Sequence, residues 1–152
     1  MPTYVCSVPP QRLTKEQKTE IATAIGRRHS DATGAPAFFV QVDIDESPTK
    51  LRFLGGTLSD AHIWIRGDIR AGRTDAVRQT LMLNIMKDVS AITGVKEQDI
   101  WIYLCNLVPT DMVEFGRVLP VPGEEQAWFE SLPAHLQAYM LSLGTTGKTF
   151  KL

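Results

Sequence analysis

The sequence predicts an α/β fold in which two β-α-β units of about sixty residues form one four-stranded sheet with two helices on one face. The first observation is a spacing: Thr14 and Thr74 each precede a segment with helical periodicity. Thr33-Gly34 and Thr93-Gly94 end these segments at the same spacing. The second observation is that short β-rich segments flank both helical segments. Because β-α-β connections are almost always right-handed with parallel strands, two such units side by side place both helices on the same face.

The first unit covers residues from about 2 to 59, and we expect a strand at 3–8, a helix at 14–32 and a strand at 38–44. Val40, Val42 and Ile44 alternate onto one face of the last strand. Thr14 and Gln17 fit a capping box, in which each side chain satisfies a backbone N–H of the first helical turn. Gly34 follows where a left-handed residue commonly ends a helix.

The second unit covers residues from about 60 to 120, with a strand expected at 61–66, a helix at 74–92 and a strand at 100–104. Thr74 and Asp75 place a cap and a negative charge at the positive end of the helix. The buried stripe of this helix is formed by apolar residues four apart, namely Val77, Leu81, Ile85 and Val89. In the last strand, Trp101 and Tyr103 lie on the face opposite Ile102.

This arrangement leaves the sheet face away from the helices bare, and the chain offers little to cover it. We therefore expect a homo-oligomer whose sheets pack against one another. An extension from about residue 121 to 152 completes a single domain, and within it residues 124–143 are expected to be helical and free to wrap a neighbouring copy. Gly144-Thr-Thr-Gly-Lys-Thr149 resembles part of a phosphate-binding loop, but Ser142 stands where the first glycine belongs. Only three residues follow Thr149, too few for the required helix, so we predict a flexible tail.

Composition narrows the possible functions. Sixteen Lys and Arg against seventeen Asp and Glu leave a net charge of −1, which argues against a nucleic-acid or membrane partner. We expect a cytoplasmic protein, because no apolar run reaches about 18 residues and the N-terminus lacks an export signal. Cys6 and Cys105 are then expected to be reduced thiols. The three histidines lie far apart in sequence and no cofactor motif is present, so we expect neither a metal nor a cofactor.

His29 is one difference between the two halves. It lies sixty residues before Val89, so the first helix carries a histidine where the second carries a core valine. A lone histidine in such a place is most often a satisfied core residue, and the nearby helix C-terminus favours its charged form. The alternative is a polar group that faces a pocket at the end of the sheet.

A second difference is the segment Arg66-Gly-Asp-Ile-Arg70-Ala-Gly-Arg73, which we expect between the end of a strand and the start of a helix. It is either a solvated loop or a site for an oxyanion or carboxylate. Arginine presents a planar fork that matches a carboxylate, and glycine lets a ligand approach the backbone. Ligands of α/β sheets also gather at the C-terminal ends of strands.

Pro2 is the third feature. Removal of Met1 would leave a free secondary amine, and α-amino groups have an ordinary pKa of about 7.7–8.0, which suits a general acid or base. Nearby arginines would lower this pKa and a nearby carboxylate would raise it. A Met-Pro start is by itself common and weak support for catalysis.

Several segments carry a family resemblance, in order along the chain from Pro2 to about Trp128. They are Arg12-Leu-Thr14, Leu54-Gly-Gly56, Arg70-Ala-Gly-Arg73, Trp101-Ile-Tyr103 and Met112-Val-Glu-Phe-Gly-Arg117, followed by Leu119-Pro120 and Pro122-Gly123. Together with the Met-Pro start they resemble the tautomerase superfamily, and within it the cis-3-chloroacrylic acid dehalogenase group. The resemblance implies a tautomerase-like fold that assembles as a trimer and uses no cofactor.

The resemblance also implies a set of functional residues, namely Pro2, His29, Arg70, Arg73, Tyr103 and Glu114. In such a site, the two arginines hold the carboxylate of a small unsaturated acid, and His29 contacts that carboxylate or a water. Glu114, helped by Tyr103, activates water for attack at C3, and protonated Pro2 delivers a proton to C2. Dehalogenation by this route yields malonate semialdehyde.

Two other functions remain open at this point. One is a keto–enol tautomerase of the phenylpyruvate type, in which unprotonated Pro2 acts as the general base. The other is a non-catalytic trimeric module that binds carboxylates. Glu114 argues against the module, because binding alone requires no group that activates water.

Overall fold

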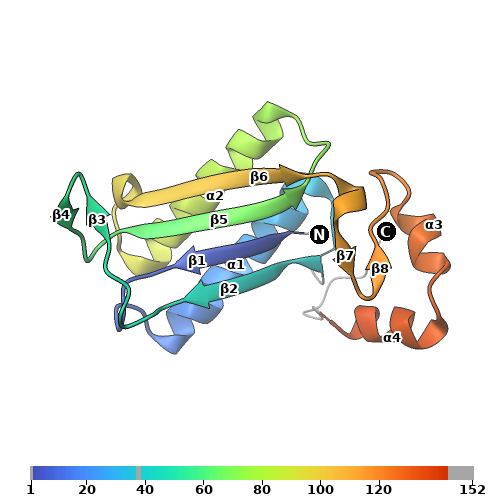
Figure 1. Ribbon diagram of the computed structural model, residues 1–152, viewed down its shortest axis with the longest axis horizontal. Helices are drawn as coiled ribbons and strands as arrows, with labels where there is room; N and C mark the ends of the chain where they lie inside the picture. The colour runs from blue at the N-terminus through green and yellow to red at the C-terminus, as the bar shows by residue number, and fades with distance from the viewer. Residues whose placement is uncertain (1, 37–38, 144–152) are drawn as a thin grey trace.

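The computed structural model describes residues 2–36 and 39–143, and its centre is the predicted four-stranded sheet with both long helices on one face (Figure 1). Met1, the start of the strand predicted at 38–44 and the predicted C-terminal tail lie outside the described residues. The strands are β1 (Thr3–Ser7), β2 (Gln41–Asp45), β5 (Ile63–Arg70) and β6 (Ile100–Leu107), and the helices are α1 (Lys15–Thr33) and α2 (Asp75–Thr93). The sequence thus predicted these helices and strands correctly, but it did not predict where several of the strands end.

The strand order β2-β1-β5-β6 brings the start of β1 beside the end of β5. Within each unit the strands are parallel, as predicted, and the two units meet through an antiparallel pairing of β1 with β5. In this register Thr3 lies opposite Asp68. Pro2 and Arg70 therefore lie at the same end of the sheet.

The helices pack on the sheet through the stripes that their sequences predict. His29 is 4% exposed and Val89 is fully buried, so these paired positions are both in the core. The capping box is present: the Gln17 N–H donates to Thr14 Oγ1 at 3.2 Å, and the Thr14 N–H donates to Gln17 Oε1 at 3.0 Å. Gly34 ends α1 with φ of 71°, in the left-handed region that the sequence called for.

Strand β5 continues to Arg70, four residues beyond the strand predicted at 61–66. The segment from Arg66 to Arg70 is therefore strand and not loop. Gly67 allows this, because a Cβ on it would lie 2.5 Å from a ring carbon of Tyr4 and 2.7 Å from a methyl of Leu104. The glycine makes room for a buried tyrosine ring across the antiparallel pair.

The duplication extends to two small hairpins, β3 (Phe53–Leu54) with β4 (Thr57–Leu58), and β7 (Val113–Glu114) with β8 (Arg117–Val118). Their two-residue turns, Gly55-Gly56 and Phe115-Gly116, have positive φ throughout, which two-residue hairpins of this type require. Phe115 has φ of 51° in a region that favours glycine. Its ring packs near Phe39 and Tyr139, at centroid distances of 6.3 and 6.4 Å.

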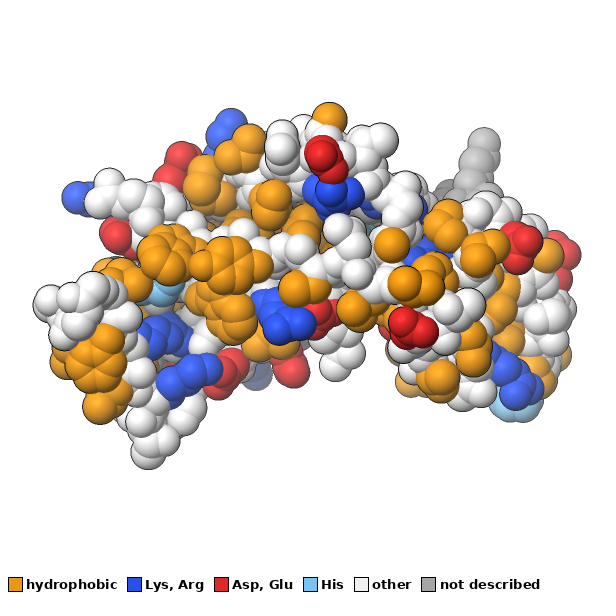
Figure 2. Space-filling view, turned by 45° about the horizontal axis from the view of Figure 1, so that its top comes forward, with side chains coloured by type: hydrophobic (Ala, Val, Ile, Leu, Met, Phe, Trp, Pro, Cys, Tyr) orange, Lys and Arg blue, Asp and Glu red, His pale blue; other side chains and the backbone are white. Residues whose placement is uncertain are grey.

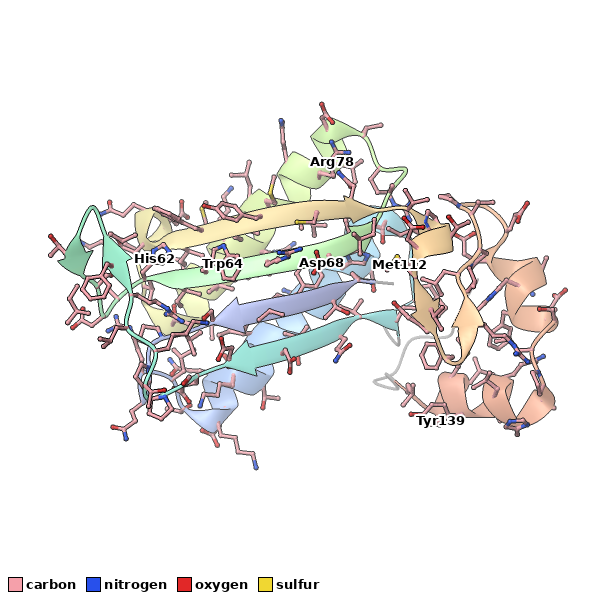
Figure 3. All side chains as sticks on the ribbon, in the orientation of Figure 1. His62, Trp64, Asp68, Arg78, Met112 and Tyr139 are labelled. Carbon is pink, nitrogen blue, oxygen red and sulfur yellow. The ribbon has the colours of Figure 1, made fainter. Side chains whose placement is uncertain are left out.

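The C-terminal part forms a lobe of its own beyond one end of the sheet (Figure 1). It contains the β7–β8 hairpin, α3 (Glu125–Glu130) and α4 (Ala134–Ser142). Its core is a second apolar cluster, made of Phe39, Met112, Leu119, Phe129, Leu132 and Met140. Figure 3 shows Met112 and Tyr139 within this lobe. The segment predicted as helical at 124–143 is thus two short helices, and they pack on their own chain.

The sheet face away from the helices is exposed in the single chain, as predicted. Trp101 and Tyr103 are 43% and 51% exposed there, and Trp64 on β5 contacts Tyr103 edge to face at 6.0 Å. Figure 2 shows hydrophobic side chains over this region and on the lobe, with charged groups between them. No helix within residues 2–36 and 39–143 has both the length and the hydropathy to cross a bilayer.

The close contact at Gly67 generates a stability prediction. Gly67→Ala forces the Tyr4 and Leu104 side chains apart and should lower the free energy of unfolding by about 1–3 kcal/mol, measured by urea denaturation. Gly26→Ala is the matched control, because its added Cβ would meet no atom within 4 Å apart from the adjacent residues and the backbone of its own helix. The control should raise stability by about 0.5–1 kcal/mol. Equal stability of both variants would contradict the packing described here.

Candidate active site

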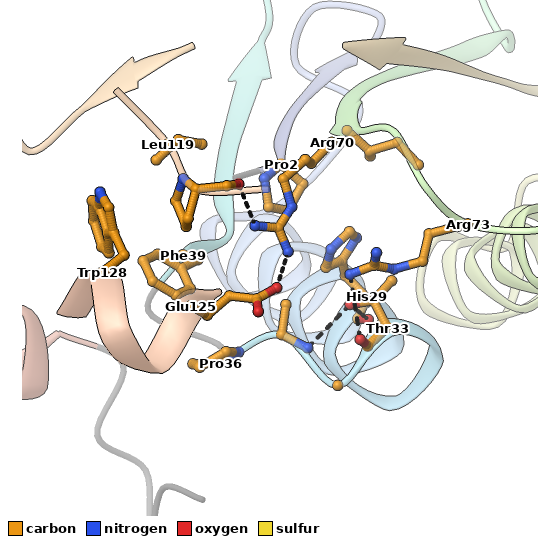
Figure 4. Close-up of a pocket in the computed structure, with 14 residues that line it drawn as sticks. Pro2, His29, Thr33, Pro36, Phe39, Arg70, Arg73, Leu119, Glu125 and Trp128 are labelled. Carbon is orange, nitrogen blue, oxygen red and sulfur yellow. Dashed lines mark hydrogen bonds and ion pairs between the residues drawn. The ribbon is translucent and has the colours of Figure 1, made fainter. Parts of the chain in front are cut away.

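A cavity of about 250 Å³ lies where the start of β1, the end of α1, the end of β5 and the C-terminal lobe meet (Figure 4). Four residues of the predicted set line it, namely Pro2, His29, Arg70 and Arg73. They come from positions up to 71 residues apart in the sequence. The lobe closes the cavity with Leu119, Pro120, Glu125 and Trp128.

Pro2 is buried immediately before β1. Its carbonyl accepts a hydrogen bond from the Gln41 N–H at 3.0 Å, so pairing with β2 begins at this residue. That bond fixes the proline ring against the wall of the cavity. The nitrogen of Pro2 is the group that removal of Met1 would expose as an amine.

His29 is held in one orientation by Tyr4. The Tyr4 hydroxyl lies 2.8 Å from Nδ1 of His29. Burial, with a smaller effect from Cys6, raises the pKa of Tyr4, so its hydroxyl keeps a proton to donate. When the Tyr4 hydroxyl donates a hydrogen bond to Nδ1, the neutral imidazole carries its proton on Nε2. That N–H is then a hydrogen-bond donor for the cavity.

His29 is neutral, although its place near a helix C-terminus favours the charged form. Burial lowers its pKa to about 4, with further contributions from the positive charges of Arg73, the N-terminal amino group and Arg70. These effects outweigh the helix dipole, which favours a cation at that end by only about 0.3–1 kcal/mol when exposed. The residue is therefore neutral at physiological pH.

Arg70 connects the sheet to the lobe. Its Nη1 donates to the Pro120 carbonyl at 3.1 Å, and its Nη2 forms an ion pair with Oε1 of Glu125 (Figure 4). The other oxygen of Glu125 accepts the Gly123 N–H at 2.7 Å. Burial alone would raise the pKa of Glu125, but backbone N–H groups and Arg70 together hold it below its ordinary value. The carboxylate is therefore ionised beside the arginine.

Arg73 lines the cavity and forms no ion pair within residues 2–36 and 39–143. Its contact among the described residues is a long hydrogen bond, 3.5 Å, from Nη2 to the Thr33 carbonyl. Burial, then the charge of Arg70, lowers its pKa, but an arginine remains a cation under these conditions. An anion entering the cavity would therefore find a ready partner in Arg73.

Two predicted site residues lie outside this cavity in the single chain. Tyr103 is on the exposed face of the sheet, because alternation along β6 directs it away from the helices. Glu114 is on the β7–β8 hairpin and lines an adjoining open groove. Phe39 borders both the cavity and that groove, and so stands between them. Arg66, the third arginine of its segment, is also outside and pairs with Asp68 at 3.0 Å.

The positions related to the four predicted cavity residues by the sixty-residue spacing do not form an equivalent second site. Sixty residues away from Arg70, Arg73 and His29 are Pro10, Leu13 and Val89. His62 stands where the first half has Pro2, and it is 5% exposed beside Trp101 at a centroid distance of 4.5 Å (Figure 3). The repeated scaffold therefore carries this combination of groups at one end.

Sequence reasoning missed Tyr4 and the residues that the lobe contributes, Glu125 and Trp128. A weak signal existed for the latter, since Leu119-Pro120 and Pro122-Gly123 lead directly into Glu125.

No group of three or more His, Cys, Asp or Glu among residues 2–36 and 39–143 is placed to hold a metal ion. The cavity thus offers cations, a neutral imidazole and a carboxylate, which suit anion binding and proton transfer.

Known proteins resemble this chain over most of its length. The model of a family described as "Putative oxalocrotonate tautomerase enzyme" matches residues 1–131. A crystal structure of N1, a member of the cis-3-chloroacrylic acid dehalogenase family, is 30% identical, covers 93% of this chain and 99% of its own, and superposes with a TM-score of 0.88. No curated protein sequence matches the chain.

Two further structures have the same architecture. The F6 fused 4-OT wild-type asymmetric trimer is 27% identical, with 83% of this chain and 98% of that chain covered and a TM-score of 0.71. Macrophage migration inhibitory factor of Toxoplasma gondii is 21% identical, with 77% and 99% covered and a TM-score of 0.66, and shows the fold alone.

The depressed pKa of His29 predicts how stability depends on pH. The unfolded chain protonates this histidine near its ordinary pKa of 6.5, whereas the folded chain resists protonation down to about pH 4. The unfolded state thus binds more protons in this window, so the free energy of unfolding rises with pH between the two values. His29→Gln should reduce that slope, by up to about 1.4 kcal/mol per pH unit, in urea titrations. The exposed His135→Gln should leave it unchanged, and an unaltered slope in His29→Gln would refute the assignment.

Proposed function

Because the chain belongs to the tautomerase superfamily, in its cis-3-chloroacrylic acid dehalogenase-like group, we propose that it is a cofactor-independent enzyme acting on a small unsaturated or enolic carboxylic acid. The observation that carries the proposal is the convergence of Pro2, His29, Arg70 and Arg73 in one cavity of about 250 Å³. Conjugate addition of water needs an electron sink, a base and a proton donor. His29, Arg70 and Arg73 correspond to the electron sink, and Pro2 corresponds to the proton donor.

The carboxylate of the substrate binds first to Arg73. That guanidinium has one long hydrogen bond and can offer a bidentate face, while Arg70 adds a second positive charge to the same wall. The Nε2 proton of His29 supplies a further donor. Together these groups draw electron density toward the carboxylate and leave C3 open to a nucleophile.

Proton transfer at C2 belongs to Pro2 after Met1 is removed. An α-amino group has an ordinary pKa of about 7.7–8.0, which suits either a general acid or a general base. In the hydratase or dehalogenase reaction, protonated Pro2 is the acid and Glu114 activates the water. With a 3-haloacrylate, Glu114 takes one proton of the water as its oxygen bonds to C3, and Pro2 gives a proton to C2. The resulting 3-halo-3-hydroxypropanoate then loses halide and its hydroxyl proton to give malonate semialdehyde.

A keto–enol tautomerase of the phenylpyruvate type is the second candidate, and one observation favours it. Neither Glu114 nor Tyr103 lines the cavity in the single chain, whereas ketonisation needs only a proton-transfer group and a carboxylate anchor. Unprotonated Pro2 would be the general base. For the hydratase chemistry, Glu114 has to reach the substrate from the groove on the other side of Phe39. Tyr103 has to come from a neighbouring copy.

A homotrimer completes the proposal. Solved relatives include fused 4-OT trimers, 25–27% identical to this chain. The exposed sheet face bearing Trp101 and Tyr103 is the surface that such packing would bury. A trimer would bring Tyr103 of one copy toward another copy, and light scattering of the purified protein measures the assembly directly.

Pro2→Ala should remove most turnover of any substrate, by about 10²-fold or more, because general acid–base catalysis contributes about 10²–10⁴-fold. The assay is kcat/KM over a panel of 3-chloroacrylates, acetylenic acids and enolpyruvates. Intact-mass analysis comes first, since a mass short by one methionine shows that the amine is free. Full activity of Pro2→Ala would overturn the proposal, and carboxylate binding without any turnover would favour the non-catalytic module.

Glu114→Gln separates the two enzymatic candidates. It should abolish hydration or dehalogenation and spare ketonisation, because only the former needs an activated water. The pH–rate profile provides an independent reading: hydration requires the protonated form of Pro2 and ketonisation the neutral form. Equal loss of both activities in Glu114→Gln would contradict the assigned roles.

Arg73→Gln should weaken binding of a small carboxylate by about tenfold or more, since a hydrogen bond to a charged group contributes about 1.5–3 kcal/mol. Arg66→Gln is the matched control, because it removes the same charge from a residue that pairs with Asp68 outside the cavity. Isothermal titration with butanoate compares the two. Equal weakening in both variants would mean that net charge alone is responsible.

A further inference from the structure

We propose that Glu125 sets the charge selectivity of the cavity, so that it accepts acids with one carboxylate and excludes dicarboxylates. The inference deepens the proposed function, because it names the substrate class of the same site. It concerns binding, however, and can be tested without turnover.

Glu125 is built into the site and is not a mobile surface acid. Arg70 Nη2 holds one of its oxygens, and the Gly123 N–H holds the other at 2.7 Å. Arg70 in turn is fixed by the Pro120 carbonyl at 3.1 Å, and its side chain is 12% exposed. Each partner of the ion pair therefore has a second contact that maintains its orientation. Figure 4 shows the ion pair and the bond from Arg70 to the Pro120 carbonyl.

The ion pair decides how much positive charge the cavity offers to a ligand. Its charged lining side chains are Arg70, Arg73 and Glu125, because His29 is neutral. Two positive charges and one negative leave a net single positive charge, to which Pro2 adds only when its freed amine is protonated. One substrate carboxylate on Arg73 balances these side chains.

A second carboxylate has no comparable place. The position against Arg70 that it would take is already filled by the carboxylate of Glu125. A dianion must either displace Glu125, and with it the first residue of α3, or lie beside a like charge in a partly buried cavity. Glu125 thus occupies, from within the chain, the place where a dicarboxylate would put its second charge.

The test measures dissociation constants of butanoate and butanedioate, two saturated acids of equal chain length, by isothermal titration at pH 7.5 and constant ionic strength. We expect the wild-type protein to bind butanoate at least about tenfold more tightly, because like-charge juxtaposition is strongly unfavourable. Glu125→Gln keeps the shape and the acceptor for Gly123 but frees Arg70. It should shift the ratio toward butanedioate by about tenfold or more.

Glu124→Gln is the matched control, since it removes the same charge from an exposed residue one position away. Its ratio should equal that of the wild-type protein. Equal binding of the two acids by the wild-type protein would overturn the proposal, even if Glu125→Gln failed to fold. An unchanged ratio in a folded Glu125→Gln, or the same shift in Glu124→Gln, would also overturn it. The expected ratios without turnover of any acid would instead overturn the proposed function and leave this inference standing.

Discussion

The ion pair between Arg70 and Glu125 is the interaction on which the site depends. Arg70 is the last residue of β5, and Glu125 is the first residue of α3, so one contact ties the sheet to the C-terminal lobe. The apolar cluster of the lobe and the hydrogen bond from Arg70 to the Pro120 carbonyl support the same junction. Loss of either partner would leave the other charge partly buried and uncompensated, which is costly.

A second constraint comes from the duplication. Both halves keep the same helix caps, left-handed glycines and hairpin turns, since these features satisfy backbone geometry that is common to each copy. The side chains that face the sheet ends have diverged, with His29 against Val89 and Arg73 against Leu13. A shared scaffold therefore carries Pro2, His29, Arg70 and Arg73 at one end of the sheet, and a different polar cluster with Ser7, Arg52 and His62 at the other.

The charge state of His29 follows from the groups that pack around it in the cavity. Burial and two arginines keep His29 neutral, although a helix C-terminus would favour its cation. Tyr4 then fixes the direction of the ring, and Gly67 leaves space for Tyr4. The neutral imidazole is thus a consequence of packing as much as of local charge.

The sequence by itself determined the units of this protein: both helices with their caps, the four strands and the bare sheet face. The set that includes Pro2, His29, Arg70 and Arg73 came from the resemblance to a known family. Periodicity and capping are local, and a duplicated pattern can be compared with itself. Only the tertiary structure decided where β5 ends, that the lobe packs on its own chain, and that Tyr103 and Glu114 lie apart from the cavity. The roles of Tyr4 and Glu125 were equally hidden, because their partners lie 25 and 55 residues away and spacing carries no record of such contacts.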